Sequence, residues 1–269
     1  VGAGLSYSGA AYQAVFRNPL ADPFLLGVAA GAALGAAIAI VSPLNAATYG
    51  FGWVPLFAFG GATLAVTLAY LVSRVGNAIS NTTLILAGVA ISSIFGSATS
   101  FLLLTGGERA RPIFSFLFGS FNTANWERLI MSVPYMLLGA IVVATHSRVL
   151  NVLQLDEEQA AQLGVDVART KLIVLAASSL IAATSVAIAG VIGFVGLIVP
   201  HAVRILFGRD HRILLPLTAL LGAAFLIATD LISRTVISPQ EIPVGIVTAV
   251  FGAPFFLYLL RTRNLDDLR

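Results

Sequence analysis

Long apolar runs separated by short polar segments are the dominant pattern along this chain. Most runs approach the roughly 20 residues that a helix needs to cross a bilayer. They are continuous, whereas the strands of a membrane barrel alternate apolar and polar positions over about ten residues. We therefore expect spanning helices over residues 1–16 (in part), 24–41, 53–73, 82–104, 129–150, 169–189, 191–206, 213–233 and 244–260.

The composition supports a membrane protein. The 269 residues are 58% hydrophobic and 10% charged, with a mean hydropathy of +0.95. Soluble domains carry about 25% charged residues. No soluble segment or long linker separates the runs, so we expect one all-α polytopic membrane domain over residues 1–269. The chain has no cysteine, which excludes disulfides and thiolate metal sites.

Prolines and small residues shape the predicted helices. Pro19 and Pro23 mark the end of one helix and the start of the next. Gly27, Gly31 and Gly35 are spaced to share one helix face, where small side chains allow close approach of helix backbones in lipid.

The positive charges indicate the orientation. If residues 17–23 are cytoplasmic, alternation of the spans places eleven basic residues inside and four outside, which agrees with the positive-inside bias. The four outside are Arg109, Arg111, Arg128 and Arg234. The C-terminus is then cytoplasmic and Val1 lies on the outer side. Because residues 1–16 begin inside a helix, we expect that a first spanning helix is missing from this sequence.

Few residues offer catalytic or metal chemistry. The three histidines lack metal-ligand spacing, and there is no HExxH sequence. With Lys171 as the single lysine, no phosphate-binding GxxxxGK[ST] loop exists, so the chain itself binds no nucleotide. Basic residues are scattered rather than clustered with aromatics, which argues against nucleic-acid binding. Asp230 and Arg234 are spaced to pair on one helix, either as an interfacial ion pair or as a functional one.

The longest cytoplasmic segment is "LQLDEEQAAQLGVDVARTK", residues 153–171. Its acidic residues favour the start of a short helix, and Gly164 favours its end. Ala160, Ala161 and Leu163 give this helix an apolar side. Such a helix suits docking into a groove on a partner protein, although the residues alone favour a solvated connector.

Several blocks of the sequence resemble one family. "EEQAAQLGV" is similar to the coupling motif of ABC importer permeases, and "RNPLADPFLLGVAAGAALGA" is similar to a signature of the FecCD-type branch, which imports iron–siderophore, haem and cobalamin. Further blocks match in the same order: "NTTLILAGVAISSIFGSATS", "AGVIGFVGLIVPHAVRILFGRDHRILLP", "TDLISR" and "EIPVGIVTAVFGAPFFLYLL". The resemblance covers the whole chain and implies a type II permease with ten spanning helices, of which nine are visible here.

The resemblance also implies roles for particular residues. A cytoplasmic coupling helix over residues 155–164 and nearby inner-face residues would contact the ATPase: Leu155, Asp156, Glu157, Glu158, Ala160, Ala161, Leu163, Gly164, Pro200, His201, Arg204, Asp210, His211 and Arg212. Ser80, Asn81 and Thr82 would form the cytoplasmic gate. Arg234 would pair with an acidic residue of the substrate-binding protein.

The expected function is import of a metal chelate by alternating access. The implied partners are cytoplasmic ABC ATPase subunits, an extracytoplasmic binding protein and a second permease copy, in a prokaryotic cell membrane. The chain would bind no cofactor and catalyse no reaction, and ATP and Mg²⁺ would bind the ATPase. We expect a ferric siderophore or haem as substrate, with cobalamin as the alternative. Two other classes of membrane protein are alternatives. An ion-coupled secondary transporter would need buried carboxylates or broken helices at the membrane midplane. A structural scaffold would not need a helix that resembles a coupling helix.

Overall fold

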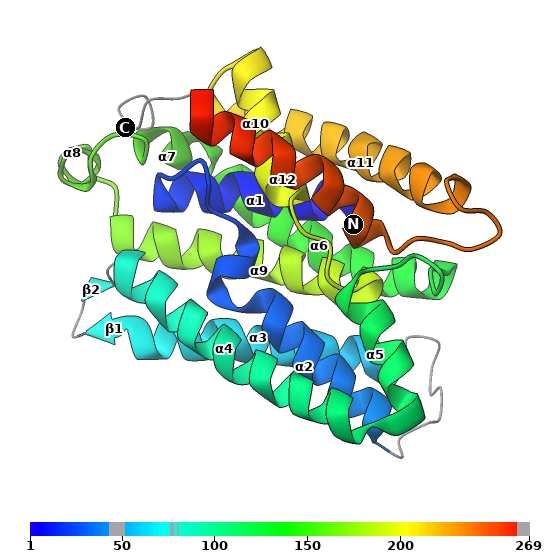
Figure 1. Ribbon diagram of the computed structural model, residues 1–269. Helices are drawn as coiled ribbons and strands as arrows, with labels where there is room; N and C mark the ends of the chain where they lie inside the picture. The colour runs from blue at the N-terminus through cyan, green and yellow to red at the C-terminus, as the bar shows by residue number, and fades with distance from the viewer. Residues whose placement is uncertain (43–51, 76–77, 80, 263–269) are drawn as a thin grey trace. The chain divides into compact units, whose positions relative to one another are not determined.

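The helices of the computed structural model follow the apolar runs of the sequence (Figure 1). The structure describes residues 1–42, 52–75, 78–79 and 81–262. Each predicted span overlaps a long helix: α1 (Gly2–Phe16), α2 (Val28–Val41), α3 (Trp53–Ser73), α4 (Asn81–Thr105), α6 (Trp126–Thr145), α9 (Val167–Ala189), α10 (Val195–Phe207), α11 (His211–Thr235) and α12 (Val244–Thr262). The expected all-α class is confirmed.

Shorter elements connect these helices. They are the 3₁₀ turns η1 (Pro23–Leu26) and η2 (Gly107–Arg109), and the helices α5 (Ala110–Leu117), α7 (Ser147–Val152) and α8 (Glu157–Gln162). Strands β1 (Arg74–Val75) and β2 (Ala78–Ile79) form a two-residue antiparallel ladder before α4. Helix α5 was not predicted, because eight residues are too few to produce a spanning pattern.

Within the described residues, five helices are long and apolar enough to cross a membrane: α3, α4, α6, α9 and α11. Helices α2 and α10 and the Val244–Tyr258 part of α12 are apolar but shorter. The chain is therefore a multi-pass membrane protein by length and composition, and the count of nine visible spans out of ten remains a prediction.

The chain divides into two compact units, which we describe separately. Unit 1 comprises residues 1–22, 139–178 and 193–269, and unit 2 comprises residues 23–138 and 179–192. Helices α6 and α9 contribute residues to both units. The expectation of one domain over the whole chain stays a prediction.

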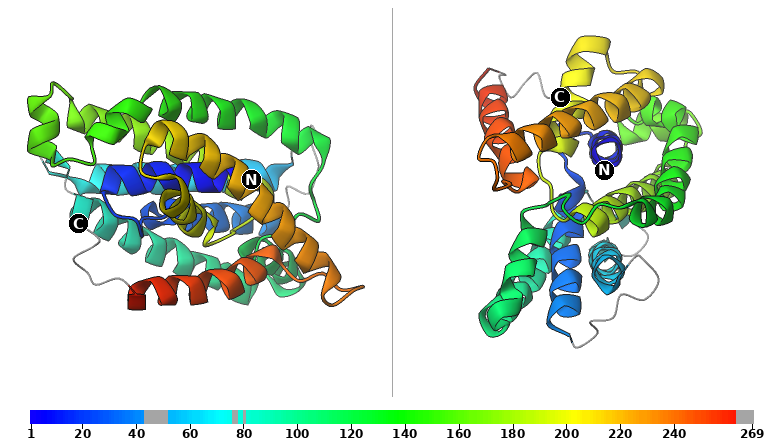
Figure 2. Two further views of the ribbon diagram at one scale, coloured as in Figure 1. Left: turned by 90° about the horizontal axis from the view of Figure 1, so that it is seen from above. Right: turned by 90° about the vertical axis from the view of Figure 1, so that its right-hand side faces the viewer.

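Helix α1 forms the core of unit 1. Nearly every residue of α1 is buried, and the helix packs against α10 and α11, as Figure 2 also shows. Gly9 lies on the backbone of Gly196, where a Cβ atom at Gly9 would overlap the Gly196 carbonyl oxygen. The Ser6 hydroxyl donates to the Thr218 carbonyl of α11 at 2.9 Å. Unit 1 therefore combines close backbone contact with buried hydrogen bonding.

Unit 2 is organised around the α2–α3 pair, with α4 packed against both helices. A Cβ atom at Gly31 would overlap the Gly61 carbonyl oxygen, and one at Gly61 would overlap the Gly31 carbonyl oxygen. Gly35 lies equally close to the Phe57 backbone. The predicted packing role is confirmed for Gly31 and Gly35. Gly27 precedes α2 as its N-cap, with φ of 83°, and lies close to Ala65 and Gly88.

Two predicted spans differ from the helices of the structure. The span 129–150 is wrong as one helix, because α6 ends at Thr145 and α7 begins at Ser147. At the break the ring Nδ1 of His146 lies 2.7 Å from the Val142 carbonyl, which the backbone N–H would bind in a continuous helix. The predicted span 191–206 starts later, at Val195, after Phe194 with φ of 68°.

Candidate functional site

Helix α8 is the predicted coupling helix, and its boundaries agree with the sequence signals. Asp156 occupies the N-cap position with extended backbone. At the other end Gly164 has φ of 83°, and its N–H donates to the Ala161 carbonyl at 2.9 Å. The N–H of Val165 donates to the Ala160 carbonyl at 3.2 Å, which completes a Schellman motif. Gly164 ends α8 because this motif needs a left-handed backbone.

One face of α8 contacts the protein and the others contact solvent. Ala160 is fully buried, whereas Glu158, Ala161 and Gly164 are exposed. Two leucines that flank the helix remain exposed, at 44% for Leu155 and 65% for Leu163. An exposed leucine at each end of a six-residue helix is an arrangement suited to a protein partner.

The loop before α8 is attached to the end of α1. The guanidinium Nη1 of Arg17 donates to the Leu155 carbonyl at 3.1 Å and to the Asp156 carboxylate at 3.0 Å. Arg17 itself adopts a left-handed backbone at the C-terminus of α1, which directs the chain out of the helix. The residues at the start of α8 are therefore joined to the end of α1 by side-chain hydrogen bonds.

A second set of contacts connects α7 to the start of α11. The side chain of Asn151 donates from Nδ2 to the Asp210 carboxylate at 2.7 Å, and its Oδ1 accepts the backbone N–H of His211 at 2.8 Å. Gln154 donates to the Arg209 carbonyl at 3.1 Å. We call Asn151, Gln154, Asp210 and His211 the α7–α11 network.

Asp210 is the N-cap of α11, and its carboxylate also accepts the backbone N–H of Arg212 at 2.9 Å. The hydrogen bond from Asn151 and this backbone bond lower the pKa of the Asp210 carboxyl below its usual value. The carboxylate is thus ionised at neutral pH, and its negative charge stabilises the N-terminal end of α11.

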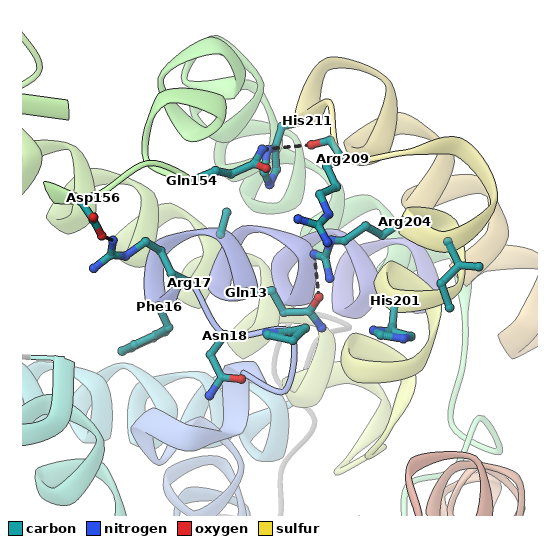
Figure 3. Close-up of a pocket in the computed structure, with 13 residues that line it drawn as sticks. Gln13, Phe16, Arg17, Asn18, Gln154, Asp156, His201, Arg204, Arg209 and His211 are labelled. Carbon is teal, nitrogen blue, oxygen red and sulfur yellow. Dashed lines mark hydrogen bonds and ion pairs between the residues drawn. The ribbon is translucent and has the colours of Figure 1, made fainter. Parts of the chain in front are cut away.

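A cleft of about 770 Å³ lies beside these contacts in unit 1 (Figure 3). Inside it the Arg204 guanidinium donates from Nη2 to Gln13 Oε1 at 2.9 Å. His201 lines the same cleft and is only 2% exposed, with its ring edge-on to Phe255. We call this feature the arginine cleft, lined by Gln13, Ala14, Phe16, Arg17, Asn18, Pro19, Gln154, Asp156, His201, Arg204, Ile205, Arg209 and His211.

The structure brings several predicted coupling residues together. Asp156, His201, Arg204 and His211 line the arginine cleft. Pro200 is buried inside α10, and Arg212 is exposed on α11. For Glu157 only the helical backbone is described.

Four residues that organise this region were not found from sequence: Gln13, Arg17, Asn151 and Gln154. Gln13 and Asn151 each carry an amide side chain within a helix that is otherwise largely made of small or apolar residues, and the sequence offered no clearer signal.

The predicted gate lies in unit 2, beside the β1–β2 ladder. Asn81 is the first residue of α4, and Thr82 is exposed in the next position. Ser80 lies outside the described residues. The ladder and the helix start hold Asn81 and Thr82 at one end of α4.

Arg234 forms an ion cluster near the end of α11. Its Nε donates to the Asp230 carboxylate at 2.8 Å, and its Nη1 lies 3.7 Å from Glu241 Oε1. The Arg234 side chain remains 42% exposed. We call Asp230, Arg234 and Glu241 the Arg234 cluster. The i,i+4 pair expected from sequence is present, and Glu241 is an additional partner.

Comparisons with known proteins place the chain in one family. Residues 1–262 match the model of the FecCD transport family. The chain is 46% identical over 268 residues to a cobalamin import system permease protein of Halobacterium salinarum, covering 100% of this chain and 71% of that protein. It is 39% identical over 269 residues to a hemin transport system permease protein of Yersinia pestis, covering 97% of this chain and 78% of that protein.

A solved structure has the same fold. It is an inward-facing conformation of an ABC transporter assigned to the metal-chelate type, with a TM-score of 0.84 and 38% identity. The match covers 97% of this chain and 82% of that one.

The chain is an ABC transporter permease subunit. It belongs to the FecCD transport family. As such it is a transport component and not an enzyme, and ATP hydrolysis belongs to a separate ATPase.

Proposed function

We propose that the chain imports a metal chelate across a prokaryotic cell membrane by alternating access, driven by a partner ATPase. The observation that carries this proposal is the attachment of α8. An exposed six-residue helix is joined through Arg17 to α1, and the segment before it is joined through Gln154 to the α10–α11 turn. Movement imposed on α8 from outside would therefore reach two helices of unit 1.

The coupling surface that we propose consists of Leu155–Gly164 with the α10–α11 turn. Exposed Leu163 and Ala161 would enter a groove of the ATPase. The α7–α11 network would hold the end of α7 and the start of α11 in fixed relative positions, because Asn151 binds both the Asp210 carboxylate and the His211 N–H. ATP binding must favour one conformation of the permease over another, since a ligand shifts an equilibrium only by its differential affinity.

At the opposite functional end we propose that Arg234 docks the substrate-binding protein. Its guanidinium is held by Asp230 yet remains partly exposed, so it is oriented before a partner arrives. An acidic residue of the binding protein would join this cluster as a charge-assisted pair.

We propose that Ser80, Asn81 and Thr82 form the cytoplasmic gate. Small polar groups would let a bulky solute pass without binding it strongly. The place of Asn81 and Thr82 beside the β1–β2 ladder supports this role, because a short ladder limits how the start of α4 can move.

The assembly that we propose contains this chain, a second permease copy, two ATPase subunits and an extracytoplasmic binding protein. The C-terminus would be cytoplasmic. No cofactor would bind the chain itself, and ATP with Mg²⁺ would bind the ATPase.

For the substrate we propose a ferric siderophore or haem, and a cobalamin as the second candidate. The hemin permease of Yersinia pestis supports the first, and the higher identity to the cobalamin permease of Halobacterium salinarum supports the second. The pathway of a permease has to let the substrate pass without binding it tightly. The substrate specificity would therefore come from the binding protein.

The test is uptake into proteoliposomes that contain the permease, its ATPase and its binding protein. Labelled ferric siderophore, haem and cobalamin are supplied in turn, with molybdate as an oxyanion control. We expect one chelate to accumulate only when ATP and the loaded binding protein are both present. Uptake driven by an ion gradient without ATP would contradict the proposal and favour a secondary transporter.

A further inference from the structure

The arginine cleft has a lining with an excess of positive charge. Three arginines line it, Arg17, Arg204 and Arg209, against one carboxylate, Asp156. In the close-up the side chains of these arginines come from the end of α1, from α10 and from the α10–α11 turn (Figure 3). Guanidinium groups bind phosphate oxygens with planar, paired hydrogen bonds. The charge of the cleft therefore favours an anion.

Two of the arginines are held in position by other parts of unit 1. Gln13 is 3% exposed and accepts the Arg204 Nη2 bond, while its own Nε2 contacts the Gly196 and Leu197 carbonyls at 3.4 Å each. Arg17 is fixed by the Asp156 carboxylate and the Leu155 carbonyl. Because these side chains are ordered in advance, they would lose less conformational entropy when an anion binds.

Arg209 completes the cleft in a different way. Its backbone carbonyl is held by Gln154, and the residue is exposed. Among the described residues its side chain forms no ion pair, so its charge is available to a ligand. Arg209 is thus the lining residue best suited to measure binding without disturbing the packing.

The last turn of α10 presents apolar side chains beside this charge. Ile205 lines the cleft and is 57% exposed, and the next residues, Leu206 and Phe207, are 70% and 53% exposed. Helix α10 is one of the shorter apolar helices of the chain. In a bilayer, the end of such a helix would meet the region between headgroups and acyl chains. Basic pockets between the ends of membrane helices are suited to anionic headgroups.

We propose that the arginine cleft binds a phosphate group, and that its source is the headgroup of an anionic phospholipid. Arg204 and Arg209 would bind the phosphate, and Ile205 would contact the acyl chain. Soluble phosphate would share the charge interactions but not the apolar contact. This site goes beyond the transport proposal. Because Arg209 also lies in the α10–α11 turn of the proposed coupling surface, the site requires that the ATPase leaves the arginine cleft open to lipid.

The test measures lipid binding to the assembled transporter in detergent. It is titrated separately with short-chain phosphatidylglycerol, short-chain phosphatidylcholine and inorganic phosphate, and dissociation constants are determined. We expect phosphatidylglycerol to bind at least about tenfold tighter than either of the others, because only it offers both a net negative charge and acyl chains.

Variants identify the site. Arg209→Ala and Arg204→Lys should each weaken phosphatidylglycerol binding about tenfold, which is the effect of losing a charge-assisted hydrogen bond. Arg204→Lys keeps the positive charge, so we expect this variant to fold. Arg148→Ala removes an exposed arginine on α7 that does not line the cleft, and its binding should equal that of the unaltered transporter.

Other results would overturn the lipid source or the site. If inorganic phosphate binds as tightly as phosphatidylglycerol and both depend on Arg209, the phosphate chemistry holds and the lipid source is overturned. Equal binding of the two lipids, or equal loss in Arg148→Ala and Arg209→Ala, overturns the site. Binding by the isolated permease that disappears in the assembled transporter would assign the cleft to an acidic segment of the ATPase and overturn the lipid site.

Discussion

The α2–α3 pair of unit 2 and the α7–α11 network of unit 1 are held together in opposite ways. Between α2 and α3 the contact is made by backbone on backbone, with Gly31 against Gly61 and no side chain between them. The α7–α11 network instead joins its elements through side-chain hydrogen bonds of Asn151 and Gln154. Shape therefore fixes the first region, and polar pairing fixes the second.

The difference relates to what each region has to do. Apolar helix faces in lipid gain no hydrophobic driving force from association, so close packing of small residues has to supply the attraction. The α7–α11 network lies at helix ends, where backbone groups need partners and a protein surface has to keep a defined shape. We expect the α2–α3 pair to tolerate no added volume and the α7–α11 network to tolerate no lost hydrogen bond.

The largest effect is expected from added volume in the α2–α3 pair. Gly61→Leu places a side chain onto the Gly31 carbonyl and should lower the free energy of unfolding by about 2–3 kcal/mol, in the upper range for overpacking. The measurement is thermal unfolding of the purified protein in detergent. Gly60→Leu is the matched control, because a Cβ atom at the neighbouring Gly60 meets nothing within 4 Å. Equal destabilisation by both variants would contradict the shape argument.

A smaller loss of stability is expected in the α7–α11 network. Asn151→Ala leaves the Asp210 carboxylate and the His211 N–H without their shared partner and should cost about 1–2 kcal/mol. The same unfolding assay measures it, together with ATP-driven uptake, which should also fall. Asn122→Ala, at an exposed position in unit 2, serves as the control. A stable but transport-deficient Asn151→Ala variant would separate stability from coupling and weaken the comparison.

The Arg234 cluster tests whether any polar cluster stabilises the fold as the α7–α11 network does. Its members are partly exposed, and such ion pairs contribute roughly 0–1 kcal/mol. Arg234→Glu should change unfolding by less than about 1 kcal/mol, yet weaken docking of the binding protein by about tenfold or more because it reverses the charge offered to an acidic partner.

Docking is measured as binding of the loaded binding protein to the detergent-solubilised permease. Arg148→Glu makes the same charge reversal at a position assigned to the other side of the membrane and should leave docking unchanged. Normal docking by Arg234→Glu would remove Arg234 from the proposed interface.

The smallest effect is an acid dependence at Asp210. A carboxyl whose pKa is lowered by folding stabilises the protein above its usual pKa of 3.8, and this contribution is lost as the pH falls through the lower folded value. The unfolding temperature of the unaltered protein should therefore fall below about pH 4 more steeply than that of Asp210→Asn. Parallel curves for the two proteins would show that the Asn151–Asp210 bond has no such role.

Much of the fold and part of the site could be predicted from sequence, because the signals are local. Apolar runs placed the helices, and the acidic start with Gly164 placed α8, since a left-handed cap must follow a helix immediately. Gly31 and Gly35 were identified as packing residues from their spacing alone.

The α7–α11 network and the arginine cleft could not be predicted in this way. Arg204 meets Gln13 across 191 positions of the chain, and Asn151 meets Asp210 across 59. No local pattern records such pairs, because neither segment specifies its distant partner. The break at His146 was missed for a related reason, since it depends on the ring bonding back to the Val142 carbonyl.

The central claim is that α8 transmits ATP hydrolysis to transport. The most direct measurement compares Ala161→Trp with the unaltered protein in the proteoliposome assay, recording chelate uptake and ATP hydrolysis together. A bulky side chain on the exposed face of α8 should lower uptake by about tenfold or more and abolish the stimulation of ATP hydrolysis by loaded binding protein, while Ala124→Trp, at an exposed position in unit 2, should behave as the unaltered protein. Full uptake with normal stimulated hydrolysis in Ala161→Trp would contradict the account.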